Sequence, residues 1–255
     1  MPIIRNDSPI LEYDDSPVSV IMPSHEKLNI RLPEKAVFAF LRDSIENFAH
    51  EYHAQIVAEF GSMTKHYPIY VVNYKGEDIC FCQAPVGAAP AAQILDWLIA
   101  YGVRKIISTG SCGTLVDLPE NAFLIPTKAL RDEGTSYHYL PPSRFVELNR
   151  PMIESIEQTL RRLNLPFAEC ITWSTDGFFR ETHDMVAYRK AEGCSVVEME
   201  CSALSACAQM RGARFGQLLF TADSLANAEI YDNRDWGAAS RDKSLLICME
   251  IAHDM

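Results

Sequence analysis

Segments with strand-like and helix-like patterns alternate along most of the chain, and this alternation restricts the possible folds more than any other feature. Several strand-like segments are apolar without strict alternation, as in the run QLLF inside 215–224. Strands of that kind are typical of a parallel or mixed sheet that helices cover on both faces. The predicted strands are 17–22, 53–60, 67–74, 77–84, 103–108, 121–130, 169–175, 195–200 and 215–224, and the predicted helices are 34–51, 91–102, 151–164, 183–193, 201–212 and 240–255.

A chain of 255 residues fits one large α/β domain more readily than two small ones. It contains no internal repeat and no long linker that would separate two parts. Residues 1–17 are aperiodic and contain Pro and Asp, which indicates an extended arm. We therefore predict an α/β fold, a single domain over 1–255 with three α/β/α layers and a mixed central sheet.

The formal net charge of the chain is -11 at pH 7. Nucleic acids and anionic membrane surfaces bind proteins through basic surfaces, so neither is expected as a partner. A small anionic ligand remains compatible with this charge, because a pocket can be locally positive in an acidic protein.

The location of the protein is predicted from three further features. The N-terminal stretch lacks the basic start and apolar core of a secretory signal. No apolar run approaches the ~20 residues that cross a bilayer. The eight cysteines form no CxxC pair and stand mostly in apolar surroundings, which is typical of small buried side chains in a reducing compartment. These features predict a cytoplasmic protein.

Polar residues interrupt the chain where predicted strands end, which is where open α/β sheets bind ligands. STGSCG at 108–113 offers backbone N–H groups and hydroxyls that suit an anion or a polar ring, although no Arg or Lys lies within it. Such a turn can equally serve to pack a strand against a helix. STDGFF at 174–179 offers Phe178 and Phe179 as a wall for stacking a flat ring, unless both belong to the core.

Carboxylates stand at two other predicted strand ends. Glu198 and Glu200 share one face of VVEMEC at 196–201, and burying both is costly unless each is hydrogen-bonded. The vicinal hydroxyls of a sugar are suitable donors, and a solvated surface pair is the alternative. Asp223 follows an apolar run, where withdrawal from water would raise its pKa and suit a general acid. A helix cap or a turn is the alternative for Asp223.

Other sequence motifs of catalysis are absent. The chain has no GxxxxGK[ST], no GxGxxG after a strand, no HExxH and no GxSxG. His138 is a lone loop histidine, so no metal site is predicted. From the residues alone, the chain is expected to be an enzyme whose small-molecule substrate contains a sugar and a flat ring.

Taken in order, these segments resemble the nucleoside phosphorylase/nucleosidase superfamily, which includes bacterial purine nucleoside phosphorylase and uridine phosphorylase. The resemblance covers about 140 residues, and its most specific part is EME followed by a small-residue helix. The matching segments are APVGAAPAAQIL (84–95), STGSCG (108–113), RDEGTSYHYLPPS (131–143), STDGFF (174–179), VVEMECSAL (196–204) and FTADS (220–224).

The resemblance implies cleavage of the N-glycosidic bond of a nucleoside through a transition state that is similar to an oxocarbenium ion. It implies that Glu200 binds the ribose hydroxyls, that Met199 packs beneath the sugar and that Glu198 supports this geometry. It further implies that Phe178 stacks on the base. Asp223 matches the acid that purine-cleaving members place at N7 of the base.

For the phosphate site, the resemblance implies that Gly110 and Ser111 donate to the anion. Phosphorylases of this group carry a Gly-Asp-Pro-x-x-Arg type segment after the first strand, and the corresponding stretch here is taken to be MPSHEKLNIR, 22–31. They also carry Arg two residues before the glycine, where this chain has Ser108. Because Arg is the preferred partner of phosphate, Lys27 or Arg31 is expected to supply the missing charge.

The expected function is phosphorolysis of a purine nucleoside to free base and ribose 1-phosphate, with inorganic phosphate as co-substrate and no cofactor. Purine is favoured because RETH at 180–183 replaces the Gln-x-Arg of uridine-specific members. The alternatives are a nucleosidase that uses water, with Glu26 as the candidate base, and a non-catalytic nucleoside-binding relative. The resemblance also implies a homo-oligomer (dimer, trimer or hexamer), in which Lys65 or His66 could reach a neighbour's site.

Overall fold

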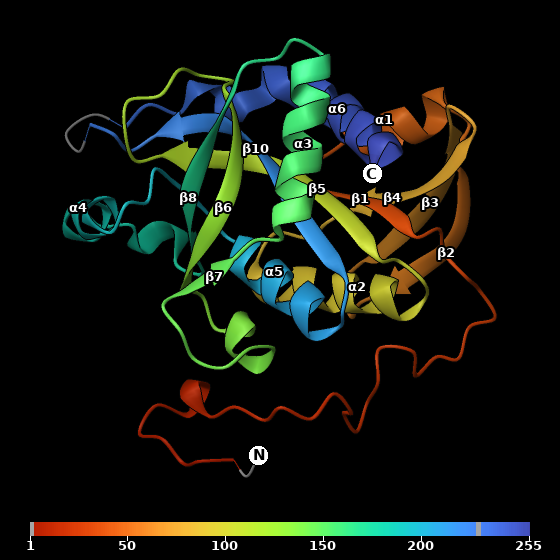
Figure 1. Ribbon diagram of the computed structural model, residues 1–255, viewed down its shortest axis with the longest axis horizontal. Helices are drawn as coiled ribbons and strands as arrows, with labels where there is room; N and C mark the ends of the chain where they lie inside the picture. Colours follow the sequence, from red (N-terminus) through yellow and green to blue (C-terminus); the bar gives the residue numbers. More distant parts are fainter. Residues whose placement is uncertain (1–2, 228–230) are drawn as a thin grey trace.

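A mixed sheet of ten strands runs through the middle of the molecule in the computed structural model, which describes residues 3–227 and 231–255 (Figure 1). The strand order is β10-β6-β8-β9-β5-β1-β4-β3-β2, with β7 beside β6. Strand β10 also pairs with β5, so that β5, β9, β8, β6 and β10 close into a ring. The strands are β1 Lys35–Ala39, β2 Gln55–Gly61, β3 His66–Tyr74, β4 Glu77–Gln83, β5 Lys105–Thr114, β6 Phe123–Asp132, β7 Phe145–Glu147, β8 Phe167–Thr175, β9 Val196–Glu198 and β10 Arg214–Ser224.

Helices cover both faces of this sheet (Figure 1). Helices α2 and α5 pack together on one face, and α1, α3 and α6 lie on the other, while α4 lies at the end near β8. The helices are α1 Ser44–Glu51, α2 Ala88–Ala100, α3 Arg150–Arg162, α4 His183–Ala191, α5 Cys201–Met210 and α6 Arg241–Asp254. The predicted three-layer α/β/α fold with a mixed central sheet is therefore confirmed.

The first strand is β1, and the predicted helix over 34–51 is wrong in its first half. Residues 36–39 are completely buried, and β1 lies between β4 and β5 with parallel pairing to both. A strand buried on both faces reads as a continuous apolar run, which periodicity alone cannot separate from a helix. The helix α1 starts only at Ser44.

The predicted strand over 17–22 is also wrong. Residues 3–34 contain one short 3-10 helix, Pro9–Leu11, and otherwise follow an irregular course along the body. Val20 is fully exposed, and residues 17–22 pair with no described strand of the sheet. The irregular segment is thus longer than the predicted arm 1–17, of which residues 1 and 2 lie outside the described residues.

STGSCG, predicted as a turn, is the second half of strand β5. It pairs with β10 as far as Thr114, and its end pairs with β9. The glycines are needed because neighbouring side chains lie against the strand: a Cβ on Gly113 would lie 2.9 Å from Leu225 Cδ1 and 3.1 Å from Val197 Cγ1. The small residues therefore let other segments approach the backbone of β5.

All eight cysteines are free and buried, as predicted from their apolar surroundings. Burial raises the pKa of the Cys80 thiol to about 12, so this side chain is an unreactive thiol at neutral pH. Among the helices of residues 3–227 and 231–255, none combines the length and apolar character that a membrane crossing requires.

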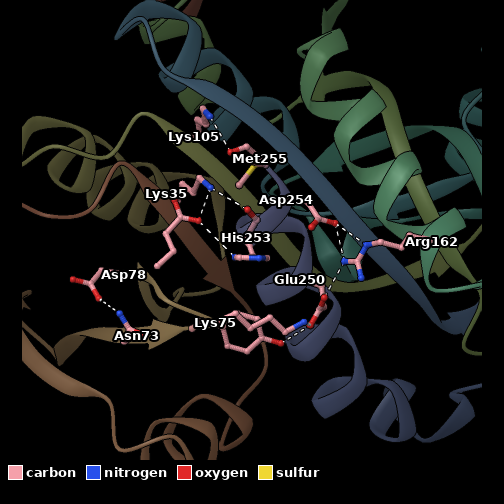
Figure 2. Close-up of polar contacts among 12 residues, drawn as sticks. Lys35, Asn73, Lys75, Asp78, Lys105, Arg162, Glu250, His253, Asp254 and Met255 are labelled. Carbon is pink, nitrogen blue, oxygen red and sulfur yellow. Dashed lines mark hydrogen bonds and ion pairs between the residues drawn. The ribbon is translucent and has the colours of Figure 1, made fainter.

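Glu250 on α6 ties that helix to the sheet and to α3 (Figure 2). Its carboxylate accepts hydrogen bonds from Lys75, from Tyr74 Oη at 2.7 Å and from Arg162 Nη2 at 2.8 Å. Burial works to raise the pKa of Glu250, but the bonds from Lys75, Tyr74 and Arg162 outweigh it and hold the pKa at about 2. Because the folded pKa lies below the unfolded one, this stabilisation is complete above about pH 5 and is lost as the pH falls toward 2.

We expect Glu250→Gln to lower the free energy of unfolding at pH 7 by about 1–3 kcal/mol. At about pH 3 the difference from the wild type should shrink, because the wild-type carboxylate is then losing its advantage. Urea denaturation at both pH values measures this. Glu120→Gln is the control, since Glu120 is exposed; a difference that is equal at both pH values would contradict the expectation.

Candidate active site

A cavity of about 490 Å³ opens where β5, β9 and β10 meet the segments that follow β1 and β8. It brings together residues that are far apart in the sequence. The predicted site residues that line it are Gly110, Ser111, Phe178, Glu198, Met199, Glu200 and Asp223.

Strand β5 runs along the cavity and lines it with residues 110–113. A Cβ on Gly110 would lie 3.2 Å from the Cβ of Phe40, so Phe40 packs against this glycine. A Cβ on Gly113 would lie 3.3 Å from Asp223 Oδ1. Since Gly110 and Gly113 are three strand residues apart, about 10 Å separates the Phe40 end of the cavity from the Asp223 end.

Glu198 shapes the turn between β9 and α5. Its Oε1 accepts from Thr172 Oγ1 at 3.1 Å and from Ser174 Oγ at 2.6 Å. Its Oε2 accepts from the backbone N–H groups of Glu200 at 2.8 Å and Cys201 at 2.7 Å. With both oxygens engaged, Glu198 holds the backbone that carries Met199 and Glu200.

Glu200 is the less satisfied carboxyl of this pair. It is buried, and its Oε1 accepts one hydrogen bond, from the N–H of Gly87 at 2.5 Å. Burial first and the charge of Glu198 second raise the pKa of Glu200 to about 8. A ligand that offers hydroxyl donors to this carboxyl would stabilise its ionised form.

Asp223 and Glu181 are a second pair of carboxyl groups in the wall of the cavity. Asp223 Oδ2 accepts from Tyr231 Oη at 3.2 Å, and burial raises the pKa of Asp223. Burial and the charge of Asp223 raise the pKa of Glu181 to about 7. Both groups can therefore carry or release a proton closer to neutrality than ordinary carboxyls.

Phe178 shares the aromatic wall of the cavity with Trp236, which the sequence did not indicate. Their ring centroids lie 6.1 Å apart at an interplanar angle of 39°. Trp236 is placed by a left-handed turn in which it has φ 52° and Gly237 has φ 63°. Phe179, which was predicted to share this wall, is 93% exposed and does not line the cavity; it lies in the short 3-10 helix Phe178–Arg180.

Two arginines line the cavity, and neither is at a position that the sequence had indicated: Arg42, just after β1, and Arg241, the first residue of α6. Arg42 has φ 52°, a strained backbone for a residue with a side chain, and forms no ion pair or hydrogen bond within the described parts of the chain. Arg241 Nη2 has one long contact, 3.5 Å to the Trp236 carbonyl. Both guanidinium groups are thus available to an anion.

Lys27 and Arg31, which were predicted to supply the missing charge, do not line this cavity. Both precede β1, whereas the cavity lies beyond the opposite end of that strand. Arg31 instead lines a separate surface depression near Tyr101. The prediction depended on a first strand at 17–22, and the stretch that follows the actual first strand contains Arg42.

Ser108 lies beneath the cavity rather than in its wall, which corrects its assignment to the anion site. It is completely buried in β5 and pairs in register with Gln217 of β10. Ser108 Oγ and Gln217 Oε1 are buried without a hydrogen-bond partner in the described residues. Gln217 does line the cavity and makes its amide available to a ligand.

The candidate general base for hydrolysis, Glu26, also lies outside the cavity. Its Oε2 accepts a hydrogen bond from Trp97 Nε1 at 2.8 Å. In residues 3–227 and 231–255, no group of three or more His, Cys, Asp or Glu side chains is arranged to hold a metal ion.

The chain is similar in sequence to known nucleoside phosphorylases. The chain is 25% identical to the guanosine phosphorylase of Halorubrum lacusprofundi over 167 residues, 63% of this chain and 67% of that protein. It is 29% identical to a DeoD-type purine nucleoside phosphorylase of Mycoplasma genitalium over 136 residues, 51% of this chain and 56% of that protein. The chain thus matches between 56% and 67% of the length of these two curated relatives.

Two solved structures show the same fold. The uridine phosphorylase of Vibrio fischeri ES114 superposes with a TM-score of 0.76 at 20% identity, over 89% of this chain and 95% of that one. The AMP nucleosidase of Bacteroides thetaiotaomicron VPI-5482 superposes with a TM-score of 0.70 at 21% identity, over 87% and 88%. The family model described as the phosphorylase superfamily matches residues 36–248. The chain therefore belongs to the phosphorylase superfamily, the group of nucleoside phosphorylases and nucleosidases that its sequence resembles.

Proposed function

We propose that the protein cleaves the N-glycosidic bond of a purine nucleoside with inorganic phosphate, releasing free base and ribose 1-phosphate. The observation that carries this proposal is the division of the cavity between two kinds of group. Protonatable carboxyls at Asp223 and Glu181 accompany aromatic rings, and Arg42 and Arg241, which form no ion pair within the described residues, line the same space.

Each part suits one part of the reactants. Phe178 and Trp236 provide a wall for a flat base, and Glu200 provides oxygens for the ribose hydroxyls. Phe40, the residue after β1, packs on Gly110, and Arg42 stands two residues further along the chain. Arg42 therefore lies at the end of the cavity away from Asp223. Arg42, Arg241 and Gln217 together offer donors to a phosphate.

In the proposed reaction, a phosphate oxygen attacks the anomeric carbon as the bond to N9 of the purine breaks. The electron pair of that bond moves into the base, and protonated Asp223 donates its proton to N7, so that the base leaves neutral. Glu200 holds the sugar during this step. The free, buried cysteines support the expectation that the protein works in a reducing compartment such as the cytoplasm.

One assay tests the proposal. The protein is incubated with inosine, guanosine and adenosine, with and without phosphate, and free base and ribose 1-phosphate are quantified. Release that depends on phosphate supports phosphorolysis. Release at the same rate without phosphate would show a nucleosidase, and tight nucleoside binding without release would show a binding protein.

Arg42→Gln is expected to raise the KM for phosphate by about 10–100-fold, because it removes a charge-assisted partner of the anion. The KM for the nucleoside should stay within about twofold, since Arg42 lies at the other end of the cavity from Asp223. Steady-state kinetics with each substrate varied in turn measures both constants. Arg31→Gln is the matched control, and an equal loss in both variants would contradict the assignment.

A further inference from the structure

Glu181 is a carboxyl in the wall of the main cavity. Among the described residues no group donates a hydrogen bond to it, whereas Glu198 has four donors, and Glu200 and Asp223 have one each. Yet Glu181 is partly buried in the wall of the cavity. A withdrawn carboxyl without a donor is costly, and a ligand could satisfy it.

Within residues 3–227 and 231–255, no cationic side chain forms an ion pair with Glu181. Asp223 of β10 lies near Glu181. Tyr231 and His183, the first residue of α4, line an adjoining cavity together with Glu181. Arg241 and Glu200 lie in the wall of the main cavity. The neighbouring negative charge of Asp223 and burial bring the pKa of Glu181 to about 7. Near neutrality Glu181 is therefore a mixture of a carboxylic acid that can donate and a carboxylate that can only accept.

The neighbouring position of Asp223 restricts which part of a purine Glu181 would meet. N7 and the 6-substituent lie next to each other on one edge of a purine, where adenine shows an acceptor and an amino donor and the 6-oxo purines show two acceptors. If Asp223 is at N7, a carboxyl beside it faces the 6-position.

We propose that Glu181 reads the 6-substituent of the base: as a neutral acid it donates to a 6-oxo group, and as a carboxylate it accepts from a 6-amino group. This inference rests on the proposed function, in that it places a purine with N7 at Asp223. Glu181 is then a specificity-determining residue, and the preference of the protein between 6-oxo and 6-amino purines changes with pH.

The test follows the ratio of kcat/KM for adenosine to kcat/KM for inosine from about pH 6 to about pH 8. In the wild type the ratio should rise by about tenfold or more, because ionisation of one group removes the donor and leaves an acceptor. In Glu181→Gln it should stay within about twofold, since an amide donates and accepts at every pH in this range. Asp184→Asn, a change of an exposed neighbouring carboxylate outside the cavity, should keep the wild-type slope.

Calorimetric binding of free adenine and hypoxanthine at the same two pH values gives a readout that needs no catalysis. If no nucleoside is cleaved with or without phosphate, the proposed function fails, while a base preference that crosses with pH still supports the role of Glu181. The inference is overturned if the wild-type preference is constant, if Glu181→Gln keeps the pH slope, or if neither base binds.

Discussion

Asp223→Asn is expected to lower kcat/KM for purine nucleosides by about 10²–10⁴-fold, the range that a positioned general acid contributes. The asparagine keeps the size of the side chain and its place beside Tyr231, but it has no proton to give to the leaving base. Burial raises the pKa of Asp223, which favours the protonated form that a general acid needs. Release of base from inosine, followed by its absorbance, measures the loss.

A nucleoside whose base is already positively charged separates the loss of the acid from a general disturbance of the site. A purine nucleoside methylated at N7 carries that charge before its bond breaks, so its cleavage does not need Asp223 as a donor. The variant should therefore cleave it at a rate within about tenfold of the wild type. If Asp223→Asn leaves inosine cleavage within about twofold of the wild type, the assignment of the acid is wrong.

Tyr231→Phe offers a graded comparison. It removes the hydroxyl that donates to Asp223 Oδ2, a bond that favours the charged form of the carboxylate. The pKa of Asp223 should then rise further, so the acid stays protonated to higher pH. The loss of kcat/KM should be far smaller than in Asp223→Asn and should diminish as the pH increases within the neutral range.

The layered fold could be predicted from the sequence because most strands and helices have patterns of different period. The predictions of secondary structure failed where the period of the apolar residues does not separate a strand from a helix, or where a strand-like pattern lacks a pairing partner. Residues 36–39 are buried on both faces, so their apolar run fits a helix as well as a strand. Residues 17–22 have the spacing of a strand but no neighbouring strand to supply hydrogen-bond partners, and such partners are decided by the tertiary fold.

The candidate site was predictable where one short segment carries the chemistry. Glu198, Met199 and Glu200 are adjacent in the sequence, and they line the cavity together. No short segment with several functional residues indicated Arg42 or Trp236 as part of the site. Arg42 depends on where the first strand ends, and Trp236 depends on a left-handed turn that only the folded chain displays. The run FLRD after the apolar segment 36–39 was the one available sign of a cation at a strand end.

Glu200→Gln is expected to lower kcat/KM for ribonucleosides by about 10–1000-fold, because hydrogen bonds to a charged acceptor contribute about 1.5–3 kcal/mol each. The amide can still accept from the N–H of Gly87, but it offers one acceptor oxygen where the carboxylate offers two. A nucleoside that lacks both the 2′- and 3′-hydroxyls forms no bond to Glu200 in the wild type. The variant should therefore handle that substrate about as well as the wild type does, and a loss of equal size on both substrates would contradict the ribose assignment.

Glu198→Gln is the matched comparison, since the two glutamates stand two residues apart in one cavity wall. Glu198 accepts four hydrogen bonds, so an amide there faces donors with its own N–H groups, and the free energy of unfolding should fall by about 2–4 kcal/mol. Burial raises the pKa of both glutamates, but among the described residues Glu200 accepts one hydrogen bond where Glu198 accepts four. The folded pKa of Glu200, about 8, lies above the unfolded value, so its buried carboxylate costs stability at every pH above the unfolded pKa. Glu200→Gln should leave the free energy of unfolding at pH 7 unchanged or higher in urea denaturation, which makes its loss of activity a property of the site and not of the fold.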